Sequence, residues 1–513
     1  MLTLKKNITR KNLDWKVLIC ACLAVNILFL FVQPKEEIGT VVAIVGMTGL
    51  ITAALLIHMW QGLRQEQLII LILIAGFILR LAYVLYTGIH TRQHDVYNFD
   101  GGIGHAGYIS YFLDTFQLPD FDPRDKFQYY HPMLHHVVAA VWMRINLQLG
   151  MAFETACKSV QLLTLFYSSA CMLIAYRIFR LFKWEGLALL VPTALVCLHP
   201  SLIILAGSIN NDILSVTLMF ASVYAAMRWN RKPTVKRIIP VALCIGGAMM
   251  AKTSGVLVAP AVAFLFLRKA WKDRQHLKKY LVQFLIFGVI CIPLGLWWSV
   301  YCNIRWDVPL GYVPTINKKL ADYSVWERFF AFEKNSIIYM AWESNPILDY
   351  SEYNIPLALL KTSLFDERTL FFSPRMEGAG RLDYAGYSIS VVLFWVNLLL
   401  VAISLLAMII LAVKRERFKN RGEGVFFFLL WFVLLAMFVI FCFQHPTTCT
   451  QEFRYAVPTL LTGAVFIGKF IAYLKEKVPE TSRLRKAALG IISGGTAGFC
   501  CLSYALYTLL GMR

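Results

Sequence analysis

Long apolar runs separated by short polar segments recur along the whole chain. Many are close to the roughly 20 residues that a helix needs to cross the hydrocarbon core of a bilayer. They do not alternate polar and apolar residues, as the strands of an outer-membrane barrel do. Because a helix satisfies its own backbone hydrogen bonds in lipid, the pattern predicts an all-α polytopic membrane protein. About thirteen spans are expected, near residues 15–33, 38–60, 67–87, 155–181, 184–206, 209–228, 238–251, 255–268, 281–301, 387–413, 424–443, 456–474 and 487–511.

The composition excludes a soluble class. Of 513 residues, 58% are hydrophobic and 16% are charged, whereas a soluble chain carries about 25% charged residues. The net charge of +20 is gathered in short basic clusters at the ends of the predicted spans. This is typical of the cytoplasmic ends of membrane helices, so we expect a lipid bilayer and no nucleic acid as partner. The first apolar run lacks a small-residue cleavage site, and we expect an uncleaved anchor.

Two longer polar segments, near residues 88–154 and 302–386, fall outside the membrane by alternation of the spans. Structureless loops of this length are uncommon and usually functional. The stretch from His131 to Leu149 has the pattern of an interfacial helix. The chain shows no internal repeat, so an inverted-repeat transporter gains no support.

The first outer loop reads RQHDVYNFDGGIGHAGYISYF over residues 92–112. His94 and Asp95 lie about one helical turn beyond the membrane, and Asp100 follows in the same loop. A glycine-rich turn holding His105 is expected next, formed by Gly101, Gly102, Gly104 and Gly107. A carboxylate near a histidine and desolvated by aromatic side chains can act as a general base. The alternative is a solvated loop with a histidine beside an acid.

This loop ends in QYYHPMLHHVVAAVW, residues 128–142. Pro132 suits the first turn of a helix. His131 and His135 would then share one face, at a spacing that could hold a metal. A divalent metal is the one cofactor considered, with Asp95 and His131 as its candidate ligands. The alternative, that these histidines only form hydrogen bonds at the interface, stays open.

The 12 cysteines form no CxxC pair, and most lie inside apolar runs as packing residues. Only Cys302 and Cys449 fall near predicted outer helix ends. A disulfide between them is one open alternative.

Three further polar groups lie where lipid makes them costly. Asn210, Asn211 and Asp212, in SINND, open a predicted helix and can act as caps. Lys252 lies between two apolar stretches. Insertion of a lysine at the bilayer centre costs about 2.5–3.5 kcal/mol, so we expect Lys252 to pair with an anion. Arg454 lies at the outer end of the twelfth predicted span, next to Glu452. An arginine and a lysine opposite a carboxylate could bind a lipid phosphate.

These motifs, in this order, resemble those of the polytopic GT-C glycosyltransferases, specifically the bacterial family 39 type. That family includes the protein O-mannosyltransferases and the lipid A aminoarabinose transferases. It has an acidic outer motif, a histidine-proline helix, an Asn-Asp turn, a Lys-x-Ser-Gly hairpin and a late Arg-Tyr-x-x-Pro. The matching residues are His94-Asp95 after Arg92, His131-Pro132 with His135, Asn211-Asp212, Lys252–Gly255, and Arg454-Tyr455 through Pro458. The outer motif is His-Asp where the eukaryotic mannosyltransferases have Asp-Glu.

The resemblance implies a GT-C type helix bundle with interfacial helices in its outer loops. It covers residues 67–475 as a catalytic membrane domain. Residues 1–66 would add two helices before it, and residues 476–513 a basic loop and a last helix.

The implied activity is an inverting transfer of one sugar from a polyprenyl-phosphate donor to an acceptor outside the cytoplasmic membrane of a bacterium. In this interpretation Asp95 takes the acceptor proton, with His94 and Asp100 beside it as catalytic candidates. The implied substrate-binding residues are Arg92, His131, His135, Asn211, Asp212, Lys252, Arg454 and Tyr455.

Two alternatives come from other classes. A transporter or flippase of a lipid-linked sugar would place charges through the midplane of several helices. A non-catalytic membrane scaffold would leave the His-Asp loop unexplained.

Overall fold

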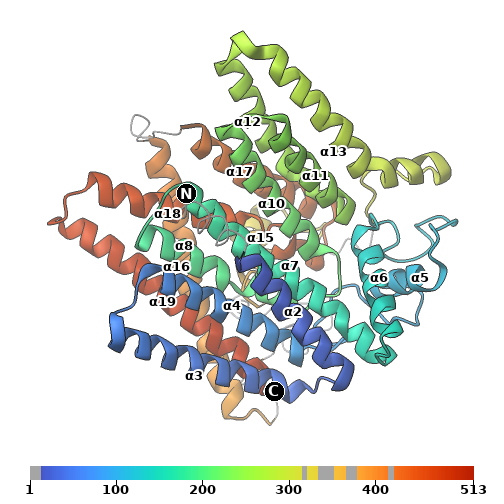
Figure 1. Ribbon diagram of the computed structural model, residues 1–513, viewed down its shortest axis with the longest axis horizontal. Helices are drawn as coiled ribbons and strands as arrows, with labels where there is room; N and C mark the ends of the chain where they lie inside the picture. The colour runs from blue at the N-terminus through green and yellow to red at the C-terminus, as the bar shows by residue number, and fades with distance from the viewer. Residues whose placement is uncertain (1–12, 315–319, 333–351, 366–371, 373–377, 414–420) are drawn as a thin grey trace, which may run out of the picture.

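The computed structural model describes residues 13–314, 320–332, 352–365, 372, 378–413 and 421–513. All regular elements among these residues are helices, so the predicted all-α class is confirmed. Most of them pack side by side in one bundle (Figure 1).

Each predicted apolar stretch is helical. The helices are α2 (Leu13–Phe31), α3 (Glu36–Gln61), α4 (Gln65–Tyr86), α7 (Phe153–Leu181), α8 (Leu187–Cys197), α9 (Pro200–Ala206), α10 (Asp212–Arg231), α11 (Val235–Ala251), α12 (Ala259–Lys272), α13 (Leu277–Trp306), α16 (Arg381–Val413), α17 (Arg421–Gln444), α18 (Thr459–Lys477) and α19 (Arg483–Leu510).

Nine helical stretches in the described ranges are long and apolar enough to cross a membrane, or ten if the pair α8–α9, bent by 43°, is one span. The chain is therefore a multi-pass membrane protein. Helices α10, α11 and α18 fall outside that count, and thirteen spans stay a prediction.

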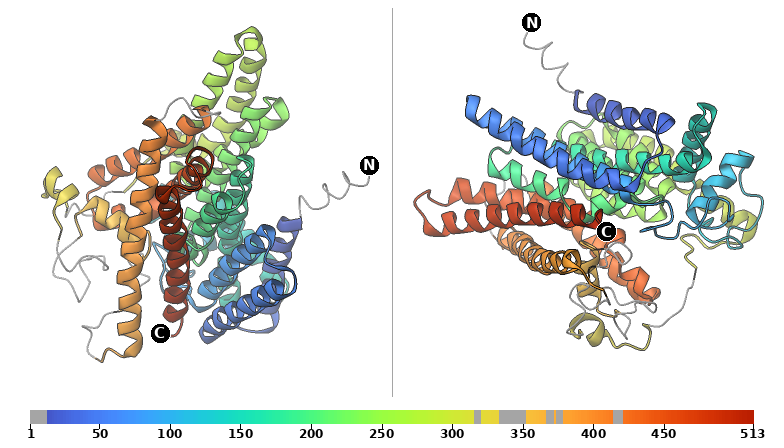
Figure 2. Two further views of the ribbon diagram at one scale, coloured as in Figure 1. Left: turned by 90° about the vertical axis from the view of Figure 1, so that its left-hand side faces the viewer. Right: turned by 90° about the horizontal axis from the view of Figure 1, so that it is seen from below.

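Helix α7 lies at the centre of the bundle, with 78% of its most apolar window buried, whereas the corresponding window of α3 is 6% buried. Helices α2 and α3 lie at the edge of the bundle (Figure 2). Apolar side chains of α3 such as Leu55 and Trp60 are exposed on the surface. Exposed apolar faces on long helices suit contact with lipid, which takes the place of water around a membrane domain.

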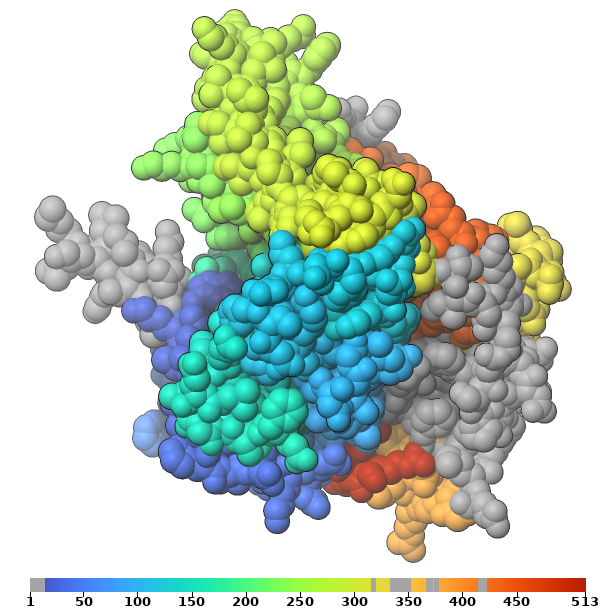
Figure 3. All heavy atoms as spheres, turned by 90° about the vertical axis from the view of Figure 1, so that its right-hand side faces the viewer, coloured from blue at the N-terminus to red at the C-terminus, as the bar shows by residue number. Residues whose placement is uncertain are grey.

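The first outer loop forms a small layer of its own, built from α5 (Gly104–Thr115) and α6 (Leu134–Gln148). Figure 3 shows its residues covering one face of the molecule below the end of α13. Helices α5 and α6 share a second apolar core with the outer end of α13. This core includes Tyr108 of α5, Met143 of α6 and Trp298 of α13. The helix expected within 131–149 is present as α6.

The expected glycine-rich turn around His105 is wrong in part. Gly104, His105 and Gly107 lie inside α5, and only Gly101 and Gly102 remain in the turn. Helix α5 can begin there because Gly104 has a φ of 75°, in the left-handed region that favours glycine.

The second outer loop, where the structure describes it, contains α14 (Val325–Phe330) and α15 (Ile355–Thr362). It packs against two short 3₁₀ helices between α17 and α18, η5 (Thr448–Gln451) and η6 (Phe453–Tyr455). Buried Arg328 donates to Gln451 Oε1 at 3.0 Å and to the carbonyl of Cys442 at 3.0 Å. These bonds tie the loop to the segment that carries Arg454. No disulfide joins Cys302 to Cys449.

The chain breaks its helical geometry at Lys252, between α11 and the 3₁₀ helix η1 (Thr253–Val258) that leads into α12. Lys252 is extended, with φ −155° and ψ 132°. Gly255 packs so closely on α11 that a Cβ there would lie 2.4 Å from the carbonyl carbon of Ala248. The Lys-x-Ser-Gly sequence therefore forms a tight corner that turns Lys252 out of the helix.

Candidate active site

The loop that follows α4 is held in an unusual backbone conformation. Arg92, Asp95 and Tyr97 have φ values of 57°, 58° and 58° in the left-handed region, which is costly for residues other than glycine. The first turn of α5 fixes this loop, because the N–H of His105 donates to Asp95 O at 3.0 Å and the N–H of Ala106 donates to Val96 O at 2.9 Å. Strain of this kind persists where the surrounding structure imposes it, commonly at functional sites.

Gln93 connects this loop to the turn before α10. Its buried amide donates to Gly207 O at 2.8 Å and accepts from the N–H of Ile209 at 3.1 Å. Asn210 Oδ1 then accepts from the N–H of Asp212 at 3.1 Å, so the expected capping role falls to Asn210. Asn211 instead donates to Ala251 O at 2.7 Å and holds α10 against the Lys252 corner.

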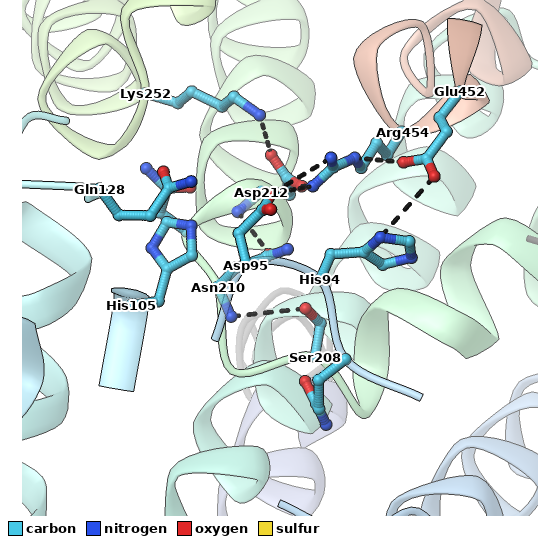
Figure 4. Close-up of polar contacts among 12 residues, drawn as sticks. His94, Asp95, His105, Gln128, Ser208, Asn210, Asp212, Lys252, Glu452 and Arg454 are labelled. Carbon is cyan, nitrogen blue, oxygen red and sulfur yellow. Dashed lines mark hydrogen bonds and ion pairs between the residues drawn. The ribbon is translucent and has the colours of Figure 1, made fainter. Parts of the chain in front are cut away.

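Four segments converge on Arg454 (Figure 4). Its two terminal nitrogens lie 3.2 and 3.3 Å from Asp95 Oδ2, and Nη1 lies 3.7 Å from Asp212 Oδ2. Its Nε forms an ion pair with Glu452. Lys252 forms an ion pair with the other oxygen of Asp212. The predicted combination of a lysine, an arginine and a carboxylate is therefore assembled, from residues as far apart as 95 and 454.

The other members of the cluster hold these charges in place. The Tyr455 ring centroid lies 4.6 Å from Lys252 Nζ and 4.9 Å from the Arg454 guanidinium, so both cations lie against the same aromatic ring. His94 Nδ1 lies 3.7 Å from Glu452 Oε1, and both side chains are buried. In the sequence, Glu452 is an acid two residues before an arginine, which is a common arrangement; the fold makes it a buried counter-charge.

The histidines form a second group beside the cluster. His105 Nδ1 and His136 Nε2 are 2.9 Å apart, and His131 stacks on His105 with ring centroids 5.5 Å apart. Burial, and then the charges of neighbours such as His131, hold the pKa of His105 well below its usual value. Burial likewise lowers the pKa of His135 to about 4. These rings are therefore neutral near pH 7.

The predicted metal arrangement of His131 and His135 is not formed. His131 precedes α6, whereas His135 lies inside it and donates from Nε2 to Ile209 O at 2.8 Å. Within the described ranges, no group of three or more His, Cys, Asp or Glu is placed to hold a metal ion. The hydrogen-bonding alternative fits these contacts.

Two other predicted residues lie away from Arg454. Arg92 turns toward α4, donating to Tyr86 O at 3.2 Å. Asp100 is exposed in the turn before α5.

Three cavities meet at this cluster. The main cavity, so named because it borders both Asp95 and Arg454, has a volume of ≈ 60 Å³ and is also lined by Gln128, Tyr130, Phe441 and Tyr455 among others. The inner cavity, of ≈ 20 Å³, is lined by Asp212, Lys252 and Arg454 with apolar Met219, Leu257 and Leu434. The outer cavity, of ≈ 270 Å³, is lined by His90, Gln93, Asp95, Val96, Tyr97 and Asn98. Arg454 borders the main and inner cavities, and Asp95 borders the main and outer cavities.

No family model matches the chain, and no curated protein matches it. Among solved structures, the chain is similar to the crystal structure of ArnT from Cupriavidus metallidurans bound to undecaprenyl phosphate. The match has a TM-score of 0.44 and 14% sequence identity, and covers 86% of this chain and 76% of the ArnT chain. At this level the likeness by itself assigns neither an activity nor a substrate to the chain.

Proposed function

We propose that the chain is a GT-C type glycosyltransferase that moves one sugar from a polyprenyl-phosphate donor to an acceptor on the extracytoplasmic face. The observation that carries this proposal is the contact of Asp95 with Arg454, beside Lys252 and at the junction of the three cavities. One carboxylate and two cations, all attached to different elements, are the groups that such a transfer requires.

The two cations suit the leaving group. When the bond between the sugar and the phosphate breaks, negative charge grows on the phosphate oxygens, and fixed positive charge stabilises it. Arg454 can offer a planar fork to two oxygens, and Lys252 a point charge on the other side. The apolar wall of the inner cavity would direct the isoprenoid chain toward the membrane.

Asp95 suits the role of general base. Its Oδ2 accepts from both terminal nitrogens of Arg454. A donor phosphate would compete for the same guanidinium and release Asp95. The carboxylate would then accept the proton of an acceptor hydroxyl while the hydroxyl oxygen attacks the anomeric carbon. The electron pair of the broken C–O bond goes to the phosphate, and a single displacement of this kind inverts the anomeric centre.

The distribution of charge along two helices supports one orientation of the chain in the membrane. Helix α10 begins at Asp212 in the cluster and ends at Arg231, and α18 begins just after Arg454 and ends at Lys477. The basic ends thus lie away from the cluster, which by the positive-inside rule supports a cluster on the outer side of the cytoplasmic membrane. The charged side chains of the cluster lie together at this outer end and are not spread along several helices, which supports a transferase over a transporter.

The test is a transfer assay in nanodiscs with a panel of labelled polyprenyl-phosphate sugars, followed by analysis of the released polyprenyl phosphate. At least one donor should be cleaved, with inversion at the anomeric carbon of the product. A protein that moves the lipid-linked sugar between liposome leaflets without cleaving it would instead be a transporter.

A further inference from the structure

The outer cavity is built against the same carboxylate that contacts Arg454. Asp95 borders both the main cavity, which Arg454 also lines, and the outer cavity. Its side chain therefore lies between the two cavities. In a displacement with inversion, acceptor and leaving group lie on opposite sides of the reacting carbon. The outer cavity is therefore where an acceptor hydroxyl would reach Asp95, on the assumption that the proposed function holds.

Tyr97 is the most unusual residue of this cavity. Tyr97 is 53% exposed although it is aromatic, and its φ of 58° is strained for a residue with a Cβ. Its ring stands edge-to-face on Phe127, with centroids 5.7 Å apart. Gly104 makes room for it, because a Cβ on Gly104 would lie 2.6 Å from Tyr97 Cδ2. The fold thus holds an aromatic ring in a fixed position at the mouth of the cavity.

The rest of the lining is polar and well positioned. Gln93 is fixed by its bonds to both sides of the 207–209 turn, while Asn98 and His90 are exposed and can turn toward a ligand. Apart from Asp95, the lining side chains carry amide, imidazole, phenol and aliphatic groups. Amides and an imidazole can both donate and accept, as the hydroxyl groups of a sugar ring require. A flat aromatic face suits the C–H face of such a ring.

We propose that the outer cavity is an acceptor subsite for an uncharged sugar ring, with Tyr97 as its stacking platform and Asn98 as a hydroxyl-reading side chain. The acceptor is accordingly a carbohydrate, either part of a glycan or a glycolipid headgroup, and not a serine or threonine of a protein. Tyr97 is a specificity-determining residue and takes no part in proton transfer.

The first experiment measures binding without a donor. Saturation-transfer NMR on the nanodisc-embedded protein would use methyl glycosides of glucose, galactose, mannose and N-acetylglucosamine, with N-acetyl-threonine methylamide as the peptide probe. At least one glycoside should receive saturation on its ring protons. Tyr97→Ala should reduce that signal by about tenfold, and Tyr97→Phe, which keeps the ring, should retain most of it.

Phe116→Ala is the matched control. Phe116 is also an exposed aromatic in the left-handed region, with φ 53°, but it lies over Arg144 at the end of α5, outside the cavity lining. Its loss should leave glycoside binding unchanged. Equal losses in Tyr97→Ala and Phe116→Ala would overturn the subsite, as would saturation of the peptide probe with no glycoside signal.

The second experiment uses the donor found in the panel above. Tyr97→Ala should raise the acceptor KM by about tenfold, with a smaller effect on kcat. A fall in kcat with no change in the acceptor KM would mean that Tyr97 supports the fold and would refute the subsite. If glycosides bind to the wild-type protein but no donor is cleaved, the transferase proposal fails and the sugar subsite stands. If a donor is cleaved but no glycoside binds, the transferase proposal stands and the sugar subsite fails.

Discussion

Asp95→Asn should change turnover and donor affinity in opposite directions. Asparagine keeps the size of the side chain and tolerates the left-handed conformation of residue 95, so the loop should remain in place. The amide cannot take a proton, and loss of a general base lowers turnover by about 10²–10⁴-fold. A folding defect would instead lower turnover and donor binding together.

The expected gain in donor affinity follows from the ion pair between Asp95 and Arg454. Asp95 Oδ2 lies 3.2 Å from Arg454, and the Asp95 side chain is 32% exposed. Two unit charges at this distance attract by about 1.3 kcal/mol in water and by about 5 kcal/mol at an effective dielectric constant near 20. Because Asp95 is partly solvated, the lower value applies, and release of that pairing should tighten donor binding by up to about tenfold.

The assay compares single-turnover release of polyprenyl phosphate with equilibrium binding of the labelled donor in nanodiscs. Asp100→Asn is the control, since Asp100 carries the same charge in the same loop and is exposed. Turnover within twofold of the wild type for Asp95→Asn would refute the base assignment. A larger loss in Asp100→Asn would move the base to that residue.

Three further predictions concern the cations, the corner and the orientation. Arg454→Ala should weaken donor binding by about tenfold or more, and Arg454→Lys should restore only part of it because the fork is lost; an affinity within twofold of the wild type would contradict the phosphate role. Gly255→Ala should lower the free energy of unfolding by about 1–3 kcal/mol in a thermal melt, because the new Cβ meets backbone at 2.4 Å. Gly288→Ala, where the nearest atom would be 3.8 Å away, should be neutral or stabilising, and equal losses would refute the packing argument. A membrane-impermeant thiol reagent should label Asp120→Cys in intact cells and miss Lys232→Cys; the reverse pattern would place the cluster in the cytoplasm.

Several site residues could be predicted from the sequence because they contrast with the residues next to them in the chain. An acid after a span, an Asn-Asp pair at a helix start and a lysine between two apolar stretches each stand out from their neighbours. The contact between Asp95 and Arg454 joins residues 359 positions apart, and no local pattern predicts it. The same limit hid Gln93 and Glu452, whose side chains matter only through partners brought close by folding.

Local patterns also gave two expectations that packing overturned. His105 was expected in a glycine-rich turn, but the backbone of α5 continues through it. Likewise, the spacing of His131 and His135 suits a metal only if both lie on one helix, and α6 begins between them. The start of a helix depends on what caps and covers it, which the spacing of two histidines does not contain.

The class of this protein and the positions of its long helices follow from the order of its residues. In lipid every backbone N–H and C=O must be paired, so an apolar run long enough to cross the bilayer forms a helix, and this constraint acts within each run separately. Which polar residues form a site depends on tertiary packing, because an ion pair or a cavity requires short distances between segments that are far apart in the chain. Asp95, Asp212, Lys252 and Arg454 become one cluster through the packing of four separate elements.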